Sequence, residues 1–302
     1  MELPAGTDAF RLIDGADYTV DVFNAVAILS VYRDYRLEEE VAIAQQLANA
    51  VLRLASGQAP LRAVYLKRRP RQAHREASAS PEQVAPPRPI WGEPIETIEV
   101  REGGARFEIR PANGLSVGLY LDARDARAWV RGHAKGLTVL NLFAYTCGFG
   151  VSALLGGATR AVNVDLSRKV LDWGERNAAL NGFAPDRRDF IAGDCFEWLG
   201  RFAKKGERFG LVVVDPPSFS NTAGHRFRAE KDYVRLIDAA KRVIAPGGIL
   251  LACCNLEGLG ASQFEREVLL GLGGKGKKLA ELGASPVDFA QPPALKVLAL
   301  QT

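Results

Sequence analysis

The stretch LNLFAYTCGFG, residues 140–150, joins an apolar run to a glycine-bearing turn. Small residues together with Gly148 and Gly150 allow a backbone to turn tightly and to approach a ligand closely. The strict G-x-G-x-x-G of dinucleotide-binding enzymes is absent. Because such a loop also fits an ordinary strand-to-helix turn, its interpretation depends on the segments around it.

Apolar, strand-like runs alternate with helix-like segments on both sides of this loop. The expected strands are TVLNLF (138–143), RAVNVD (160–165), RDFIAGD (188–194), GLVVVD (210–215) and GILLACC (248–254). The segments SRKVLDWGERNAALN (167–181) and EKDYVRLIDAAKRVI (230–244) are typical of helices. This alternation predicts an α/β fold, a mostly parallel sheet with helices on both faces. Ser262 and Glu265 form a capping-box pattern that predicts the start of a late helix.

Acidic residues end the second and third of the expected strands. Asp165 follows the glycine loop by about 20 residues, the spacing expected of an acid that binds ribose hydroxyls. Alternatively, Asp165, followed by Leu166 and Ser167, starts the next helix. Asp194, followed by Cys195 and Phe196, can accept a hydrogen bond from an adenine amino group while apolar neighbours cover the ring, or it can cap a helix.

The fourth strand ends in VVVDPPSF, residues 212–219. Proline fixes φ and lacks an N–H donor, so Asp215, Pro216 and Pro217 predict a stiff loop at the rim of a site. Phe219 is placed to stack on a base held out for reaction. The alternative is a rigid turn followed by a core phenylalanine. Together, a glycine loop and three acids on successive strand ends are far more specific than any one of them.

The chain divides into two expected regions, 1–94 and 95–302. The first is a smaller α+β region with strand-like runs FRLID and YTVDVFNAVAILSVY, an amphipathic segment LEEEVAIAQQLANAVLRLA and a run LRAVYLK. It ends in a proline- and arginine-rich linker, about 68–94. Residues 62–75 hold a cluster of basic side chains without an acid among them: Arg62, Lys67, Arg68, Arg69, Arg71 and Arg75. Such a cluster suits an RNA backbone, and it also fits a solvated loop.

The composition, 302 residues with 47% hydrophobic and 25% charged, is that of a globular protein. No apolar run approaches the ~20 residues of a membrane helix, and the first residues lack a signal-peptide layout. We therefore expect a cytoplasmic protein with no membrane partner. The four cysteines form no C-x-x-C pair, so no metal site is expected.

Several segments resemble the large-subunit ribosomal RNA methyltransferases of bacteria. They are NLFAYTCGFGVSALLGGATRAVNVDLS, ERNAALNG, DPPSFSN and PGGILLACCN. FRLIDGADYTVDVFNAVAILSVYRDY, LRAVYLKRRPRQ and GLYLDARDAR resemble the guanine-N7 half of a bifunctional member. The resemblance implies a Rossmann-like class I fold, S-adenosylmethionine as methyl donor and RNA as substrate.

The family's binding residues carry over position by position. The donor loop falls on Phe143, Tyr145, Thr146 and Gly148. The donor-contacting acids fall on Asp165, with Leu166 and Ser167 beside it, on Asp194, with Cys195 and Phe196, and on Asp215. An upstream donor segment falls on Leu121, Asp122 and Arg124, where the family often has glutamine and this chain has Ala123.

The target base has two candidates. Cytosine C5 is a poor nucleophile, and its methylation needs a cysteine thiolate. The cytosine-modifying relatives carry that thiol at the position of Asn255, so the reaction would require a shift to Cys254. Guanine N7 has a lone pair and no proton to lose, so alignment alone suffices. We favour guanine N7, with cytosine C5, a small-molecule or protein substrate, and a non-catalytic module that binds S-adenosylmethionine and RNA as alternatives.

Overall fold

A computed structural model describes residues 4–32, 36–54, 60–69, 80–217, 219–222, 225–289 and 294–302. The chain forms two compact units. The first comprises Met1–Leu121 with Pro286–Gln291, and the second comprises Asp122–Ser285 with Pro292–Thr302. The sequence-based division at residue 94 stays a prediction. No helix in the described ranges is both long and apolar enough to span a membrane.

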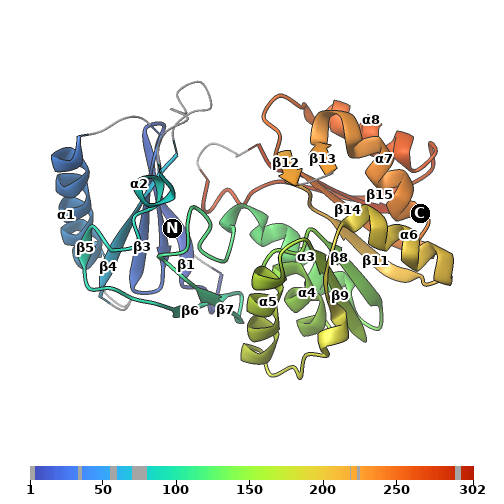
Figure 1. Cartoon of the computed structure of the whole chain (residues 1–302), viewed down its shortest axis with the longest axis horizontal. Coiled ribbons are helices and arrows are strands. Elements are labelled where there is room, and N and C mark those ends of the chain that lie inside the picture. Colours follow the sequence, from blue (N-terminus) through green and yellow to red (C-terminus); the bar gives the residue numbers. More distant parts are fainter. Residues whose placement is uncertain are drawn as a thin grey trace. The chain divides into compact units, whose positions relative to one another are not determined.

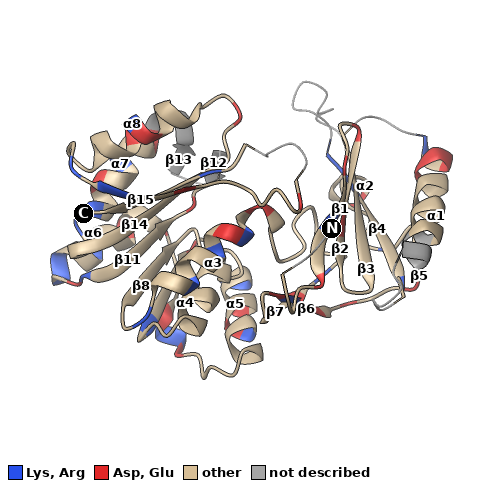
Figure 2. Cartoon of the chain, turned by 180° about the vertical axis from the view of Figure 1, so that it is seen from behind, with Lys and Arg blue, Asp and Glu red and all other residues tan. Residues whose placement is uncertain are grey.

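The first unit is built on a five-stranded sheet of order β1-β2-β3-β4-β5. Its strands are β1 (Ala9–Asp14), β2 (Tyr18–Phe23), β3 (Val26–Val31), β4 (Ala63–Arg68) and β5 (Trp91–Gly92). β3 and β4 pair in parallel, so the chain must cross over between them, and α1 (Leu37–Leu54) lies in that connection. The acidic first turn of α1 is red in Figure 2. A hairpin of β6 (Ile98–Glu102) and β7 (Ala105–Ile109) follows.

The expected linker is structured over much of its described part. Residues 80–94 contain α2 (Pro81–Val84) and β5, and β5 pairs with β4 as an edge of the sheet. A capping box between Ser80 and Gln83 starts α2. Sequence analysis did not identify these two elements within the expected linker, because a one-turn helix and a two-residue strand leave no periodic signal. Residues 70–79 lie outside the described ranges.

The second unit is built on a seven-stranded sheet of order β10-β9-β8-β11-β14-β16-β15. Its strands are β8 (Thr138–Leu142), β9 (Arg160–Asp165), β10 (Phe190–Ala192), β11 (Phe209–Val214), β14 (Ile244–Cys254), β15 (Lys277–Leu282) and β16 (Lys296–Gln301). The first five are parallel, and β16 is antiparallel to both of its neighbours. The α/β fold expected from the sequence is confirmed.

Helices cover both faces of this sheet (Figure 1). One face packs against α3 (Arg124–His133) and α4 (Gly148–Leu155), and α5 (Arg168–Leu180) follows β9. The other face packs against α6 (Cys195–Lys205), α7 (Ala229–Lys241) and α8 (Ala261–Gly271). Short pieces complete the unit: η2 (Leu121–Ala123), η3 (Arg187–Asp189) and a hairpin of β12 (Phe219–Thr222) with β13 (His225–Arg228). The predicted capping box at Ser262 is wrong, because α8 begins at Ala261 with Gly260 as its N-cap, so Ser262 lies inside the first turn.

The strand order places a topological switch point at the carboxyl ends of β8 and β11. β8 lies between β9 and β11, so the chain moves outward in one direction through β9 and β10 and in the other through β11 and β14. In open α/β sheets, ligands bind beyond the carboxyl ends of the strands at this switch point. The loop after β8 and the Asp-Pro-Pro segment after β11 both lie there.

Candidate functional site

The loop after β8 holds three non-glycine residues in the left-handed region of backbone conformation. Phe143, Tyr145 and Cys147 have φ angles of 56°, 49° and 61°. Such conformations cost on the order of 1–3 kcal/mol each and cluster at ligand sites. Gly148 and Gly150, which we expected to make this turn, instead lie in the first turn of α4 without positive φ. A Cβ on Gly150 would overlap Asn163 Oδ1, so this glycine serves the packing of α4 on the sheet.

Helix α5 holds the loop in this conformation. Asn177 is fully buried and donates a 2.9 Å hydrogen bond from Nδ2 to the Thr146 carbonyl oxygen. Gly174 faces Cys147 so closely that a Cβ would overlap its Sγ. Sequence reasoning missed both residues, although Gly174 and Asn177 lie three residues apart, a spacing that places two residues on the same helix face.

Asp165, at the end of β9, accepts a hydrogen bond on each carboxylate oxygen. Tyr145 N–H donates to Oδ2 and Ser167 N–H donates to Oδ1, both at 2.9 Å. Burial raises the pKa of Asp165, and the backbone N–H donors oppose this shift. Each oxygen keeps a lone pair that can accept from a hydroxyl group. The carboxylate therefore links the loop after β8 to the start of α5 and still has acceptor capacity.

Asp194 is the N-cap of α6. Its Oδ1 accepts hydrogen bonds from Phe196 N at 2.8 Å and Glu197 N at 3.1 Å, which leaves Oδ2 for another donor. Cys195 is buried, whereas Leu166 is 46% exposed after β9. Helix capping, one of the two sequence interpretations, is thus part of what Asp194 does, and it occupies one oxygen only.

Asp215 follows β11 and lies close to Asp122 and Arg127. Burial and the carboxylate of Asp122 raise the pKa of Asp215 to about 7, against the opposing effect of the Arg127 guanidinium. Arg127 and Arg124 are both buried on α3. Of the upstream segment predicted from the resemblance, Asp122 in η2 lies close to Asp215, and Arg124 starts α3. Leu121, the first residue of η2, is buried.

The Asp-Pro-Pro loop continues into the β12–β13 hairpin. Pro216 is buried and Pro217 is exposed. The backbone of Phe219 begins β12, but its side chain lies outside the described part of the chain, as does all of Ser218. The expected stacking of Phe219 on a base stays a prediction.

The two cysteines near the end of β14 are buried in the sheet. Cys253 and Cys254 are 1% and 2% exposed and pack into opposite cores. Burial raises the pKa of both thiols, that of Cys253 well above its usual value. Asn255, which follows them, is exposed. Among the described residues, no three His, Cys, Asp or Glu side chains gather as metal ligands would.

The basic cluster of residues 62–75 is not a uniform solvated loop. Arg62 pairs with Glu93, and Arg68 donates to the buried Glu40. Lys67 is fully buried on β4. These three positions depart from the solvated-loop interpretation, because they lie on or beside a strand whose alternate residues face opposite sides. Contact of the cluster with RNA stays a prediction. Arg71 and Arg75 lie outside the described ranges.

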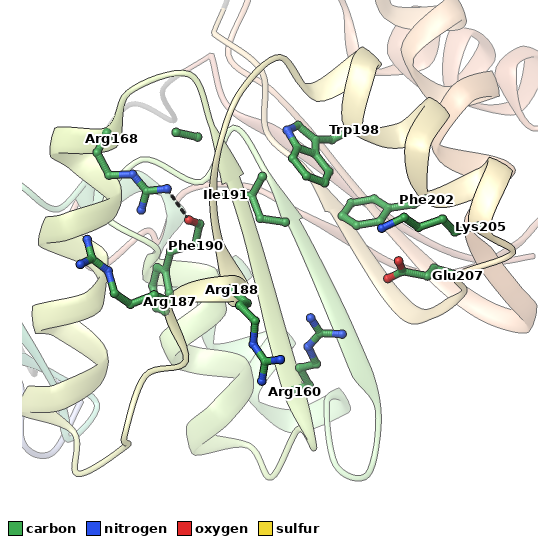
Figure 3. Close-up of a pocket in the computed structure, with 11 residues that line it drawn as sticks. Arg160, Arg168, Arg187, Arg188, Phe190, Ile191, Trp198, Phe202, Lys205 and Glu207 are labelled. Atoms are coloured by element: carbon green, nitrogen blue, oxygen red, sulfur yellow. Dashed lines mark hydrogen bonds between the residues drawn. The ribbon is translucent and has the colours of Figure 1, made fainter.

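A hollow lined by arginines lies beside β10, between α5 and α6 (Figure 3). Arg168 donates to the Phe190 carbonyl oxygen at 2.7 Å. Its other arginines pair with acids: Arg160 with Asp189, Arg187 with Glu175, and Arg188 with Asp186. Trp198 and Phe202 line the side formed by α6. Because carboxylates compensate these guanidinium groups, the hollow has little uncompensated charge.

The fold and the strand-end site together define a class I methyltransferase. The profile of the S-adenosylmethionine-dependent methyltransferase family matches residues 11–270. This chain belongs to that family, and its methyl donor is S-adenosylmethionine. A crystal structure of a methyltransferase complexed with SAH has a TM-score of 0.84 at 24% identity, covering 98% of this chain and 76% of that one. A SAM-dependent methyltransferase from Agrobacterium tumefaciens has a TM-score of 0.68 at 17% identity, covering 99% and 90%.

Relatives with assigned substrates match the chain in part. Ribosomal RNA large subunit methyltransferase I of Aeromonas salmonicida is 41% identical over 170 residues, 55% of this chain and 43% of the relative. Ribosomal RNA large subunit methyltransferase K/L of Psychrobacter sp. is 41% identical over 155 residues, 50% of this chain and 19% of the relative. The chain thus spans less than half the length of these relatives.

Proposed function

We propose that this methyltransferase modifies RNA, that its substrate is large-subunit ribosomal RNA, and that its target atom is guanine N7. The partial similarity to ribosomal RNA large subunit methyltransferases supports the substrate class. The basic composition, with a net charge of +4, agrees with a polyanionic partner. The choice of base rests on the chemistry of Asp215 with Asp122 and on the burial of Cys253 and Cys254.

The strand ends are suited to hold the donor. In this proposal Asp165 accepts from the ribose hydroxyls with the lone pairs that Tyr145 and Ser167 leave over. Asp194 Oδ2 accepts from the adenine amino group. The exposed Leu166 and the partly buried Phe196 cover the adenine ring. The loop from Phe143 to Cys147, which includes Tyr145 and Thr146, contacts the donor through its backbone, and Gly148 starts α4.

The pairing of Asp215 with Asp122 is the observation that carries the proposal. Two neighbouring carboxylates disfavour each other's charge, and the Arg127 guanidinium offsets this effect only in part, so a further cation is favoured beside Asp215. S-adenosylmethionine supplies a methyl group activated by a positively charged sulfonium. Methylation of guanine N7 leaves the positive charge on the purine. Asp215 and Asp122 can therefore stabilise positive charge before and after transfer, and no residue has to remove a proton.

The same residues also give the reaction its geometry. Pro216 and Pro217 restrict the backbone after Asp215, so the carboxylate and the rim of the site move little. Phe219 lies four residues beyond Asp215 and is proposed to stack on the guanine. Alignment of N7 with the methyl carbon is then the main requirement for catalysis.

Cytosine C5 is the second candidate, and the cysteines speak against it. A thiolate is the nucleophile that this reaction needs, and burial raises the pKa of Cys253 and Cys254. Cys254 lies within the paired part of β14, opposite Lys296 of β16. A buried thiol on a strand whose backbone is paired with its neighbour is poorly placed to attack a base.

Methyl transfer from radiolabelled S-adenosylmethionine tests the substrate class. The full chain is incubated in parallel with ribosomal RNA, ribosomal protein and the small-molecule fraction of a strain that lacks the gene. We expect label in the RNA alone, and none with an Asp165→Ala variant. Label in protein or small molecules, with unlabelled RNA, would contradict the proposal.

A further inference from the structure

Lys67 and Arg69 lie on one face of the first unit's sheet. Val64 and Leu66 of β4 pack with Ala44 of α1 on the opposite face. Since successive residues of a strand alternate between faces, Lys67 and Arg69 point away from α1. In the parallel pairing with β3, Lys67 lies directly opposite Ser30.

A row of buried polar side chains crosses the sheet at this point. Ser30 is also in register with Thr19 of β2, so Thr19, Ser30 and Lys67 form a line across three strands. Their exposed fractions are 4%, 2% and 0%. Arg69 donates from Nε to Ser30 Oγ at 3.3 Å and from Nη2 to the Leu115 carbonyl oxygen.

No carboxylate among the described residues compensates this pair of cations. Lys67 Nζ has no hydrogen-bond partner in the described part of the chain. Burial and the positive charge of Arg69 lower the pKa of Lys67 to about 8. The acceptors that Arg69 uses, a hydroxyl and a carbonyl, are both neutral.

Other arginines of the same unit are held differently. Arg68, the residue between the pair, donates from Nε to Glu40 Oε1 at 2.8 Å. Arg11 donates from Nε to Asp21 Oδ1 at 2.7 Å, and the exposed Arg62 pairs with Glu93. A buried charge without a partner is costly, so two adjacent ones are expected where an anion binds.

We propose that Lys67 and Arg69 form a phosphate-binding site for the backbone of the RNA substrate. Arg69 is partly exposed and forms the outer part of the site, and Lys67 lies behind it. The assignment to RNA rests on the proposed function, whereas the anion site itself does not.

The chemistry of the pair fits a phosphodiester. A lysine ammonium offers three donors, and a guanidinium offers five in a fork that matches two phosphate oxygens. Arg69 uses two of its five N–H bonds within the described residues. Ser30 Oγ accepts from Arg69 and keeps its own hydrogen to donate. Donors of three kinds thus lie beside one another, and no acid among the described residues pairs with the two cations.

The test measures the pKa of Lys67 in the full chain by NMR of 13Cε-labelled lysine, with the signal assigned by its loss in Lys67→Met. The titration is repeated with saturating oligouridylate and with inorganic phosphate. We expect oligouridylate to raise the pKa of Lys67 by at least one unit from about 8. Oligouridylate contains neither guanine nor cytosine, so this result does not depend on the target base.

Binding of the same oligouridylate to variants gives a second readout. Lys67→Met and Arg69→Gln should each lower affinity about tenfold and reduce the slope of log K against log salt by about 0.7. Arg62→Gln, which removes an exposed, ion-paired arginine, is the control and should change neither value appreciably. S-adenosylmethionine affinity should be unchanged in all three.

Two outcomes would overturn the proposal. One is an unchanged pKa of Lys67 at saturating oligouridylate, together with full affinity of Lys67→Met. The other is a response to inorganic phosphate without any response to RNA. If oligouridylate binds as expected but ribosomal RNA is not methylated, the phosphate site stands and the proposed function falls.

Discussion

Asn177 of α5 donates a 2.9 Å hydrogen bond to the Thr146 carbonyl oxygen, and both residues are buried. The bond lies beneath a loop in which Phe143, Tyr145 and Cys147 adopt left-handed conformations. Because such conformations are unfavourable without support, the strained loop depends on a helix that follows it by more than twenty residues.

Replacing Asn177 with leucine should therefore destabilise the loop conformation, although the side chain changes little in size. The Thr146 carbonyl would be left buried without this donor, at a cost of about 1–3 kcal/mol. Urea denaturation checks the loss of stability, and calorimetry checks a parallel loss of S-adenosylmethionine affinity. Asn181→Ala, which removes a part-buried side-chain hydrogen bond at the C-cap of the same helix, is the control for general damage to α5. Wild-type stability and donor affinity in Asn177→Leu would rule out this role.

Asp165→Ala should lower donor affinity by about 1–3 kcal/mol, since it removes the acceptors proposed for the ribose and leaves the Tyr145 N–H without its partner. Isothermal titration with S-adenosylmethionine measures the effect. Asp186→Ala, at an exposed carboxylate of the same unit, should leave affinity unchanged. Equal donor affinity for a folded Asp165→Ala protein and the wild type would remove Asp165 from the site.

The affinity for S-adenosylmethionine should increase with pH up to about 7. In the free protein the pKa of Asp215 is about 7, above the usual value of 3.8, so below pH 7 the carboxyl group is mostly protonated. A cationic sulfonium favours the ionised form, so binding releases a proton in this range. The affinity gain should approach tenfold per pH unit well below the pKa.

S-adenosylhomocysteine lacks the positive charge and is the control. The ratio of the two affinities removes the titration of the amino-acid groups that both ligands share. This ratio should rise between pH 5.5 and 7 and then level off, and Asp215→Asn should make it independent of pH. A flat ratio in the wild type would separate Asp215 from the sulfonium.

The cysteines distinguish the two bases. Double replacement of Cys253 and Cys254 with alanine should cost packing stability but change the rate of methyl transfer by no more than about tenfold, because guanine N7 needs no nucleophile. Loss of several orders of magnitude would indicate cytosine. RNA containing 5-fluorocytosine should form no denaturation-resistant adduct. An adduct that disappears with Cys254→Ala would overturn the choice of base and leave the methyltransferase family intact.

Lys67 predicts an unusual pH dependence of stability. Its folded pKa of about 8 lies below the usual 10.5, so between these values the unfolded chain holds a proton that the folded chain has released. The free energy of unfolding should therefore rise with pH from about 8 to 10.5, by on the order of 3 kcal/mol. Urea denaturation of wild type and Lys67→Met measures the difference, and the variant should lack the rise. Lys204→Met, at an exposed position, is the control, and a rise retained in Lys67→Met would assign it to other groups.

The residues that sequence analysis identified are those next to apolar strands. Asp165 ends β9 and Asp215 directly follows β11, so an apolar run followed by an acid is enough to identify them. Asn177 and Gly174 give no such signal, since their roles depend on which helix face meets the loop. The burial of Lys67 gives no signal for a related reason, since a run of basic residues does not show which of them the pleat of β4 turns inward. Strand ends are local properties of sequence, whereas the partner of a buried side chain is decided by tertiary packing.

Identification of the modified nucleoside tests the central claim most directly. The enzyme is incubated with labelled S-adenosylmethionine and large-subunit ribosomal RNA from a strain lacking the gene, and the RNA is digested to nucleosides and separated by mass spectrometry. The account predicts that the label is recovered in 7-methylguanosine, and that Asp215→Ala loses most of it. Label recovered in 5-methylcytidine would contradict the assignment of the base, and the absence of label from every nucleoside would contradict the assignment of RNA as substrate.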